Sequence, residues 1–507
     1  MNLFWIKFLF LLTFICFPLS SFGQQNDSPV RITFLHVNDV YQFMPVDGGM
    51  RGGLARVLTL RKEALKENPH TIFTMGGDTI SPSVETRTYK GAQMIDAWNA
   101  VGIDYAVFGN HEFDLKTDVL LERMKESKFV WLGANVFDTQ TNKIFADTPP
   151  FVLREFDGVK VGIIGFLLPE TKQTSSMEAY LEVQNYCDVA KKLVPQMRQQ
   201  GANAVIGLTH LSMTQDKELA KCADFDLILG GHEHTLLQSS SNGTPIFKMT
   251  ADARELGKFN FNFNRQTKKL ESLDWEIIPV TDKIADAPEF AVVFDKYKDL
   301  LQKLAEPVGM TTVLLDARSA ENRTQETNVG NFVADAFRQA TNADVALVNG
   351  GSIRADLTYN PGVLTKRAVL SMLPFNNPVV KIEISGKTLR QAIEHGIARS
   401  AEDSEHGRFP QVSGMSFKFD TTLPANERLT EIKVGGKPLD EHKTYTLATA
   451  SFLVLNGGDG YTMFKDAKIL INTDKAQKDA EILENAIKAA PNKTIAPKVE
   501  GRIVRIK

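Results

Sequence analysis

Cysteine is scarce in this sequence, with three residues among 507. Cys16 lies within an apolar leader, so only Cys187 and Cys222 belong to the rest of the chain. The spacing of two cysteines alone does not indicate whether they are bonded to each other. A single disulfide and a pair of buried free thiols are therefore both open.

An excess of either charge is also missing, because 58 basic residues face 61 acidic ones and leave a net charge of −3. A nucleic acid polymer is therefore not expected as the main partner, although local arginines can still bind small anions. The sequence has no long low-complexity tract, and its apolar content of 43% indicates a packed globular protein. At this length, two or three domains are expected.

Long apolar runs are limited to the first 23 residues, MNLFWIKFLFLLTFICFPLSSFG. Lys7, the apolar run 8–17, Pro18 and the small-residue exit at 21–23 are typical of a secretory signal peptide. The run has about ten residues, whereas a helix that spans a bilayer needs about twenty. We therefore expect residues 1–23 to be removed, the mature chain to have no stable membrane span, and the protein to be periplasmic or extracellular.

Metal-ligand residues stand at the ends of five strand-like apolar runs in the first half of the chain. The runs are ITFLHVND, IFTMGGD, YAVFGN, AVIGLTH and DLILGGHEH. Doubly wound α/β sheets present binding groups beyond the carboxyl ends of their strands, so residues far apart in sequence can converge on one crevice. The candidate ligands are Asp39, Asp78, Asn110, His210, His232 and His234.

These residue types fit two divalent metal ions about 4 Å apart, because such a pair needs one bridging carboxylate with imidazoles and further oxygens around it. Asp78, which follows two glycines, is the expected bridge. The first ion is expected to bind Asp39, Asp78 and His234. The second ion is expected to bind Asp78, Asn110, His210 and His232. Zinc, manganese and magnesium all remain open as the ions.

His111 follows Asn110 directly, and Asp114 stands three residues later. An imidazole that a carboxylate orients can polarise a phosphate oxygen or protonate a leaving group. We therefore expect His111 and Asp114 to act in catalysis rather than as metal ligands. His36, in the first strand-like run, is expected to be a structural histidine. The paired glycines before Asp78 and His232 should let the backbone approach the ions closely.

The ordered motifs NDxx, GGD, GNHEFD, a strand ending in histidine and GGHEH resemble the calcineurin-like metallophosphatase superfamily. In the second half, residues 322–354 and the motifs LPFNN, RFPQVSGM and NGGDGY resemble the C-terminal domain of secreted 5′-nucleotidases and UDP-sugar hydrolases. The resemblance implies an α/β fold, in which a four-layer α/β/β/α metallophosphatase sandwich is followed by a smaller α+β substrate-binding domain.

The predicted domain boundaries follow this division. Residues 29–285 alternate strand-like and helical runs and form the metallophosphatase domain. Residues 286–308 include apolar positions at helical spacing and form a linker helix. Residues 309–507 form the substrate-binding domain.

One motif departs from the resembled family, which usually reads D-x-H where this chain has Asp39-Val40-Tyr41. A phenol with an ordinary pKa of about 10 is a poor ligand at neutral pH unless the metal removes its proton. We expect Tyr41 to bind a water that replaces the imidazole, with weak ligation or no role as alternatives. The first ion should then be held more weakly and should be a harder, oxygen-preferring ion.

The resemblance also places a nucleotide site in the second half of the chain. Arginine forks can grip phosphate oxygens, a carboxylate can accept ribose hydroxyls, and two aromatic rings can stack on any base. The positions carried over are Arg323, Asn349, Arg354, Phe375, Phe452 and Asp459.

Phe452 departs from the usual spacing of this set. The usual pattern places the second aromatic residue six positions before the aspartate, whereas Phe452 stands seven before Asp459 and Leu453 takes the expected position. Either the loop absorbs one residue and Phe452 stacks on the base, or only Phe375 does so.

Three functions remain open at this stage. An exported 5′-nucleotidase that hydrolyses nucleotides by in-line attack of water, assisted by both ions, is favoured. A UDP-sugar hydrolase or a 2′,3′-cyclic-nucleotide phosphodiesterase of the same family is the first alternative. A nucleotide-binding surface protein with weakened catalysis is the second. The oligomeric state is not predicted.

Overall fold

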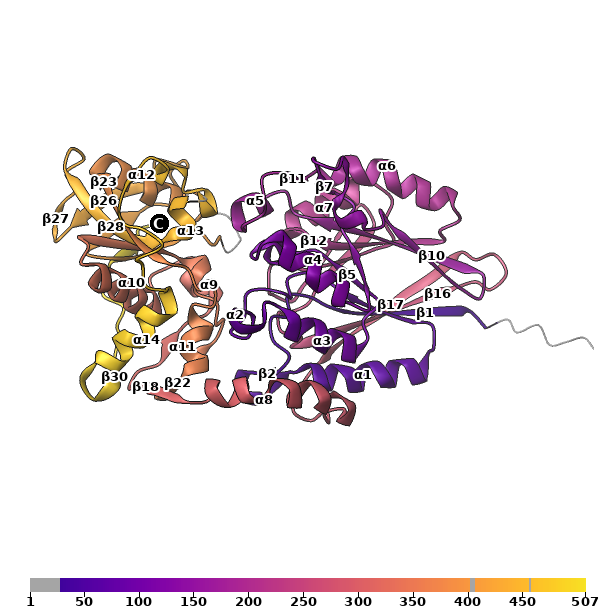
Figure 1. Ribbon diagram of the computed structural model, residues 1–507. Coiled ribbons are helices and arrows are strands. Elements are labelled where there is room, and N and C mark those ends of the chain that lie inside the picture. Colours follow the sequence, from indigo (N-terminus) through magenta and orange to yellow (C-terminus); the bar gives the residue numbers. More distant parts are fainter. Residues whose placement is uncertain (1–27, 402–405, 456) are drawn as a thin grey trace, which may run out of the picture.

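The computed structural model describes residues 28–401, 406–455 and 457–507, which form two lobes joined along one side by helix α8 (Figure 1). The predicted signal peptide lies outside these residues. Within the described part of the chain, no helix combines the length and the apolar character needed to cross a membrane.

The first lobe is built on two six-stranded sheets whose central strands run parallel. The first sheet has the order β17 (Leu270–Pro279), β16 (Glu255–Phe263), β1 (Val30–Val37), β4 (Thr71–Met75), β5 (Tyr105–Val107) and β6 (Val130–Leu132). The second has the order β14 (Leu237–Ser241), β15 (Thr244–Lys248), β13 (Leu227–Gly230), β12 (Ala204–His210), β10 (Val159–Leu167) and β9 (Val152–Phe156).

The two sheets pack face to face on a core of fully buried apolar side chains, among them Phe34, Ile163, Ile206 and Phe261. Helices cover the outer faces, with α1 and α3 on one side and α6 and α7 on the other (Figure 1). The covering helices are α1 (Leu54–Glu67), α3 (Ala92–Val101), α4 (Thr117–Glu126), α6 (Tyr186–Gln199) and α7 (Met213–Cys222). The expected four-layer α/β/β/α sandwich is therefore confirmed.

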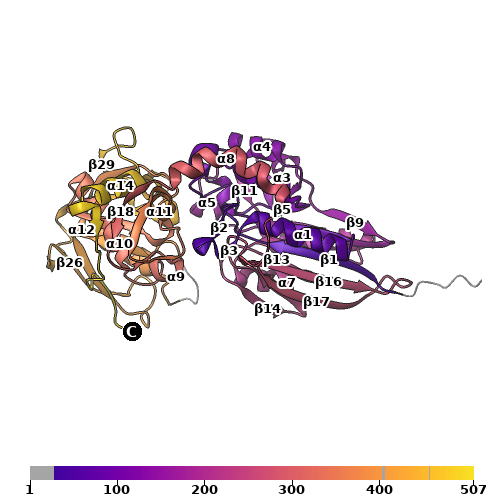
Figure 2. The ribbon, with the colours of Figure 1, turned by 90° about the horizontal axis from the view of Figure 1, so that it is seen from below.

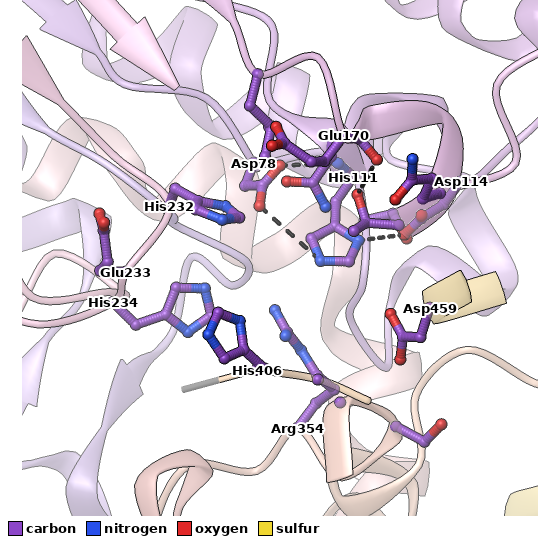
Figure 3. A pocket seen from close by; sticks show the side chains of 18 of the residues that line it. Asp78, His111, Asp114, Glu170, His232, Glu233, His234, Arg354, His406 and Asp459 are labelled. Atoms are coloured by element: carbon purple, nitrogen blue, oxygen red, sulfur yellow. Dashed lines mark hydrogen bonds and ion pairs between the residues drawn. The ribbon is translucent and has the colours of Figure 1, made fainter. Parts of the chain in front are cut away.

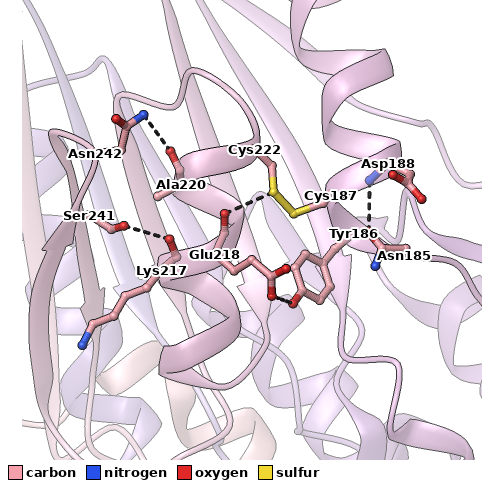
Figure 4. Close-up of a disulfide and its surroundings, with 10 residues drawn as sticks. All are labelled: Asn185, Tyr186, Cys187, Asp188, Lys217, Glu218, Ala220, Cys222, Ser241 and Asn242. Atoms are coloured by element: carbon pink, nitrogen blue, oxygen red, sulfur yellow. Dashed lines mark hydrogen bonds between the residues drawn. A yellow bond between two sulfur atoms is a disulfide. The ribbon is translucent and has the colours of Figure 1, made fainter.

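A disulfide between Cys187 and Cys222 joins α6 to α7 on the outer face of the second sheet (Figure 4). Asn185 caps α6 by accepting from the backbone N–H of Asp188 at 3.1 Å. Tyr186 donates its hydroxyl hydrogen to Glu218 of α7 at 2.5 Å. Of the two states that the sequence left open for these cysteines, the structure contains the disulfide.

Helix α8 (Ala291–Leu304) packs on the first lobe before the chain enters the second (Figure 2). Its Tyr297 and the preceding Phe290 pack around Phe43 at ring-centroid distances of 5.8 and 6.4 Å. A helix therefore lies where the linker was predicted, while the boundaries of the domains remain a prediction.

The second lobe is a smaller mixture of helices and sheets. Its main sheet has the order β24 (Pro410–Ser413), β20 (Val345–Asn349), β28 (Thr444–Ala450), β23 (Val379–Ser385) and β29 (Lys468–Ile471). A second sheet has the order β27 (Lys437–Pro438), β26 (Leu429–Val434), β25 (Met415–Phe419) and β31 (Ile503–Arg505). The main helices are α10 (Asn328–Thr341), α11 (Lys366–Met372), α12 (Gly386–Ile397) and α14 (Asp479–Ala489).

Candidate metal centre and active site

All six predicted metal ligands lie in the first lobe where parallel strands of the two sheets end. They are Asp39 after β1, Asp78 after β4, Asn110 after β5, His210 at the end of β12, and His232 and His234 after β13. Ligand atoms of Asp39, Asp78 and His210 lie within 4.8 Å of one another, and all three side chains are buried. The structure thus brings both sheets' ligand residues to one place.

Asp78 occupies the middle of this cluster. Its Oδ1 accepts a hydrogen bond from the backbone N–H of His111 at 2.8 Å. Its Oδ2 lies 3.2 Å from His210 Nε2 on one side and 3.1 Å from Tyr41 Oη on the other. One oxygen is therefore fixed by the main chain, while the other faces groups in both halves of the centre.

The half of the centre around His210 has its imidazole oriented by the backbone. His210 Nδ1 lies 2.8 Å from the carbonyl oxygen of Gly76, and Nε2 lies 3.2 Å from Asn110 Oδ1. With Nδ1–H donating to the carbonyl, Nε2 points into the cluster and offers a lone pair whenever the ring is neutral. Burial alone would lower the pKa of His210, but the charge of Asp78 raises it to about 10, so the cluster attracts positive charge. The ring of His232 packs against His210 at 5.2 Å.

The other half of the centre is built around Asp39. Its Oδ2 accepts hydrogen bonds from the backbone N–H of His232 and from Asn38 Nδ2, both at 2.8 Å. Its Oδ1 lies 3.3 Å from His234 Nε2. Although burial raises the pKa of Asp39, the hydrogen bond and charge of His234 outweigh it and bring the pKa to about 2. This carboxylate is therefore ionised at any neutral pH.

The backbone at these positions is unusual. Asp39, Asp78, His232 and His234 all have positive φ, at 53°, 58°, 90° and 58°. Conformations of this kind cost about 1–3 kcal/mol each and gather at functional sites. Gly77 has a φ of +85°, and a Cβ there would lie 2.6 Å from His210 Nδ1, so the predicted close approach of the glycine pair is present.

Tyr41 lies inside the cluster rather than beside it. Its hydroxyl oxygen is 2.8 Å from His234 Nε2 and 3.4 Å from Asp39 Oδ1. Arg354 of the second lobe donates to the same oxygen at 3.0 Å, and its guanidinium lies over the tyrosine ring at 5.4 Å. The departure from D-x-H thus places a phenol among the ligand atoms and links it to the other lobe.

His111 and Asp114 form the expected pair. Nδ1 of His111 lies 2.8 Å from Asp114 Oδ2, which also accepts from the hydroxyl of Ser81 at 2.8 Å. Nε2 of His111 lies 4.0 Å from Asp78 Oδ2 and faces the centre (Figure 3). His36, by contrast, is fully buried between Thr74 and the carbonyl of Gly230, as a structural histidine should be.

Glu112 was given no role by the sequence reading, although it lies within the GNHEFD motif. Its buried carboxylate accepts hydrogen bonds from the backbone N–H groups of Asp78 at 2.9 Å, Thr79 at 2.7 Å and Ile80 at 3.1 Å. It also accepts from the backbone of Gly109. Glu112 therefore fixes the loops that carry Asp78 and Asn110, and its place in the motif was the signal for it.

A second missed group lies beneath the loop of His232 and His234. Lys248 is fully buried and forms ion pairs with Asp216, at 2.9 Å, and with Glu233. Its ammonium also donates to the carbonyl oxygens of Leu211 and Gly231, the latter at 2.8 Å. The three charges hold the ligand loop against α7, and no local sequence signal joins Lys248 to its partners.

A cavity of about 1620 Å³ opens between the lobes and contains most of the predicted site residues. Figure 3 shows His232, His234 and His111 of the first lobe together with Arg354 and Asp459 of the second. The predicted substrate-binding residues that line it are Arg323, Asn349, Arg354, Phe375, Phe452 and Asp459.

The predicted substrate-binding residues occupy two regions of this cavity. Phe375 lies at the metal centre, with its ring 5.7 Å from that of His111 and 5.9 Å from the Arg354 guanidinium. Asn349 donates to Asp459 at 2.6 Å in the second lobe, where the ring of Phe452 packs against Gly458. In α13 (Ser451–Leu455), Phe452 faces the cavity and Leu453 is buried in the core.

The cavity depends on contacts between the lobes. Arg87 of α2 (Thr86–Tyr89) donates to the carbonyl of Pro374 at 3.1 Å and pairs with Asp479 of α14 at 3.3 Å. Arg367 of α11 pairs with the buried Glu85 at 2.8 Å. Two ion pairs therefore join the lobes beside the site. The first lobe supplies the arginine in one pair and the carboxylate in the other.

A two-sheet sandwich with carboxylate, amide and imidazole groups at its strand ends defines a metallophosphatase. Residues 32–236 match the family model of the calcineurin-like phosphoesterase, and residues 307–466 match that of the 5′-nucleotidase, C-terminal domain. The chain therefore belongs to the 5′-nucleotidase family, whose members join these two domains.

Individual relatives agree with this assignment. The chain is 30% identical to protein 5NUC of Lutzomyia longipalpis, over 96% of this chain and 94% of that protein. It is also 30% identical, over 94% of its length, to the trifunctional nucleotide phosphoesterase protein YfkN of Bacillus subtilis, of which it spans 35%. The crystal structure of a 5′-nucleotidase precursor from Thermus thermophilus is similar with a TM-score of 0.86 and 26% identity, over 94% of this chain and 99% of that one.

Proposed function

We propose that this chain is an exported, metal-dependent 5′-nucleotidase that removes the 5′-phosphate of nucleotides. The observation that carries the proposal is the shared cavity, in which metal-ligand residues of the first lobe face Arg354 and Phe375 of the second. A hydrolytic centre and a nucleotide pocket are thus combined in one space. Neither lobe alone supplies both the metal-ligand residues and the residues for the nucleotide.

The ligand set fits divalent ions. Asp39 and Asp78 each have one oxygen fixed by backbone N–H donors and one turned toward imidazole nitrogens. Carboxylate, amide and oriented imidazole groups are the donors that zinc, manganese and magnesium take in proteins. Two such ions, when bound, would supply Lewis-acid activation of the phosphoryl group and of the attacking water.

The remaining residues act on the substrate. His111, held by Asp114, presents Nε2 to the centre, where it can donate a hydrogen bond to a phosphoryl or leaving-group oxygen. Arg354 reaches the same point and can bind a phosphate oxygen. Phe375 and Phe452 offer ring faces to the base, and Asp459 offers a carboxylate to the ribose.

Export is supported by the leader-like segment 1–23 and by the disulfide between Cys187 and Cys222, because disulfides persist in oxidising compartments. A periplasmic or extracellular enzyme would meet nucleotides outside the cytoplasm.

The test is a substrate panel. The metal-reconstituted protein would be incubated with AMP, a UDP-sugar, 2′,3′-cyclic AMP and an artificial phosphodiester, and the products of each substrate would be identified by chromatography, with and without the Asn110→Ala substitution. We expect AMP to be hydrolysed fastest and the Asn110→Ala variant to be nearly inactive. Preference for the UDP-sugar or the cyclic nucleotide would favour the related hydrolases. No turnover of any substrate would leave a nucleotide-binding protein.

A further inference from the structure

Three potential ligand atoms lie around the Tyr41 hydroxyl oxygen in the half of the centre around Asp39. Tyr41 Oη lies 2.8 Å from His234 Nε2, 3.1 Å from Asp78 Oδ2 and 3.4 Å from Asp39 Oδ1. His234 Nε2 in turn lies 3.3 Å from Asp39 Oδ1. Atoms held about 2.1 Å from one ion lie about 3.0 Å apart at a right angle and about 3.4 Å apart at a tetrahedral angle. These four separations are therefore close to those expected between neighbouring ligands of one ion.

The single phenol hydrogen can serve only part of this arrangement. A phenol has one hydrogen, so Tyr41 can donate to only one of its three neighbours, and the carboxylates of Asp39 and Asp78 can only accept. A cation among the four atoms interacts favourably with all of them at once. The two carboxylates beside the Tyr41 hydroxyl therefore favour a cation at this place.

The phenol is also held in place from the other sides. The backbone N–H of Tyr41 donates to Asp252 Oδ1 at 3.0 Å, and its ring meets that of His234 edge to face at 5.4 Å. Arg354 donates to the hydroxyl oxygen at 3.0 Å, and its guanidinium lies over the ring. The positive charge of Arg354 favours an electron-rich oxygen at Oη, which is what a metal ligand offers.

We propose that Tyr41 is a direct ligand of the first metal ion through its phenolic oxygen, instead of binding it through a water. This inference rests on the proposed dinuclear centre. The first ion would then have three oxygen donors, from Asp39, Tyr41 and Asp78, and one nitrogen donor from His234.

The two halves of the centre would consequently differ in chemistry. The second ion would have oxygen donors from Asp78 and Asn110 and nitrogen donors from His210 and His232. An oxygen-rich site favours harder ions such as manganese, whereas a site with two imidazoles suits zinc. The centre would therefore prefer two different ions when both are supplied.

The test compares metal binding by the full chain and three variants after removal of metal with a chelator. Manganese or zinc would be added back, the ions retained after dialysis counted by elemental analysis, and the ultraviolet difference spectrum of metal-bound phenolate recorded. Tyr41→Phe removes the hydroxyl, and Tyr41→His restores the usual imidazole. Tyr105→Phe is the matched control, because the Tyr105 hydroxyl also accepts from an arginine, Arg154, but lies outside the ligand set.

We expect two ions and a phenolate spectrum in the unaltered chain and in Tyr105→Phe. Tyr41→Phe should lose the spectrum and bind one of the two ions at least about tenfold more weakly, since even outer partners of metal ligands are worth about 10- to 100-fold in affinity. Tyr41→His should bind the first ion firmly again, with a stronger preference for zinc.

Two results would overturn the inference in distinguishable ways. Weaker binding in Tyr41→Phe without any phenolate spectrum in the unaltered chain would assign Tyr41 to a bridging water and leave the proposed function standing. If the unaltered chain bound no metal at all, the dinuclear centre and the proposed function would fall together with the inference.

Discussion

The candidate metal centre and the proposed nucleotide pocket are built in different ways. In the first lobe, Asp39, Asp78 and His210 each have one atom fixed by a main-chain group and another turned to the centre. In the pocket, the ring of Phe375 and the guanidinium of Arg354 belong to the second lobe but lie against groups of the first. The centre is therefore a property of one domain, whereas the pocket is a property of how two domains meet.

This difference predicts where substitutions act. Changes in the first lobe should alter metal binding and the chemical step, because the ligands sit on a rigid frame of strand ends and buried carboxylates. Changes in the second lobe or between the lobes should alter substrate affinity or the stability of the docked arrangement.

The largest expected effect is that of Asp78→Asn. The substitution keeps the shape of the side chain and its acceptor for the N–H of His111, but removes the charge that faces both halves of the centre. Loss of the bridging carboxylate should lower kcat/KM by roughly 1000-fold, or about 4 kcal/mol. Kinetics at saturating metal, with elemental analysis in parallel, would check this. Activity within tenfold of the unaltered enzyme would show that Asp78 does not bridge.

Lys248→Met should lower activity less than Asp78→Asn does, but it should lower the free energy of unfolding strongly. The variant leaves the buried carboxylate of Asp216 and the partly exposed carboxylate of Glu233 without their cation, and breaking a buried pair in this way typically costs about 3–5 kcal/mol. Chemical denaturation would measure the loss, and metal affinity should fall because the His232–His234 loop is no longer anchored. Lys258→Met is the matched control, since its partner Glu67 is solvent-exposed and such a pair is worth at most about 1 kcal/mol. Equal effects of the two substitutions would contradict the anchoring role.

Asp479 offers a test of the lobe contact by pH. Burial raises the pKa of its carboxyl from 3.8 to about 6, despite the charge of Arg87. Because the folded pKa exceeds the unfolded one, the folded protein binds more protons between about pH 4 and pH 6, and this group's contribution to stability falls as the pH rises through that range. A shift of about two units corresponds to about 3 kcal/mol.

The comparison needs Asp479→Asn, which does not titrate. The difference in unfolding free energy between the unaltered chain and this variant, measured with a chelator present, should favour the unaltered chain more at pH 4 than at pH 6 and then stay constant. A difference that grows with pH would mean that Arg87 outweighs burial and that the lobes are held by a charged pair.

The parts of the site that the sequence predicted are those fixed by local order. Asp39, Asp78 and His210 follow strand-like runs directly, and parallel strands bring their carboxyl ends to one edge, so the convergence could be expected. Lys248 could not be found in this way, because it meets Asp216 and Glu233 only through the pairing of β15 with β13 and the packing of α7. Such long-range contacts leave no periodic mark in the sequence.

Tyr41 shows a second limit of sequence reading. The D-x-Y motif revealed that an imidazole was missing, but the position of the phenol depends on Asp252, His234 and Arg354, which come from other strand ends and the other lobe. The sandwich itself was predictable, since alternating strand-like and helical runs are local features. Which residues of a short helix face the cavity and which face the core was not predictable from the sequence.

The smallest and most selective effect is expected at that short helix. Phe452 faces the cavity from α13 while its neighbour Leu453 is fully buried in the core. Phe452→Ala should therefore raise KM for AMP by roughly tenfold, the equivalent of about 1–2 kcal/mol of lost stacking, with little change in unfolding free energy. Leu453→Ala should do the reverse and destabilise the second lobe by about 2–5 kcal/mol through a cavity. If Leu453→Ala raised KM in a still fully folded protein while Phe452→Ala did not, the base would be read at the position that the usual six-residue spacing marks. In the pocket, Leu453 rather than Phe452 would then contact the base, while the metal centre would be unaffected.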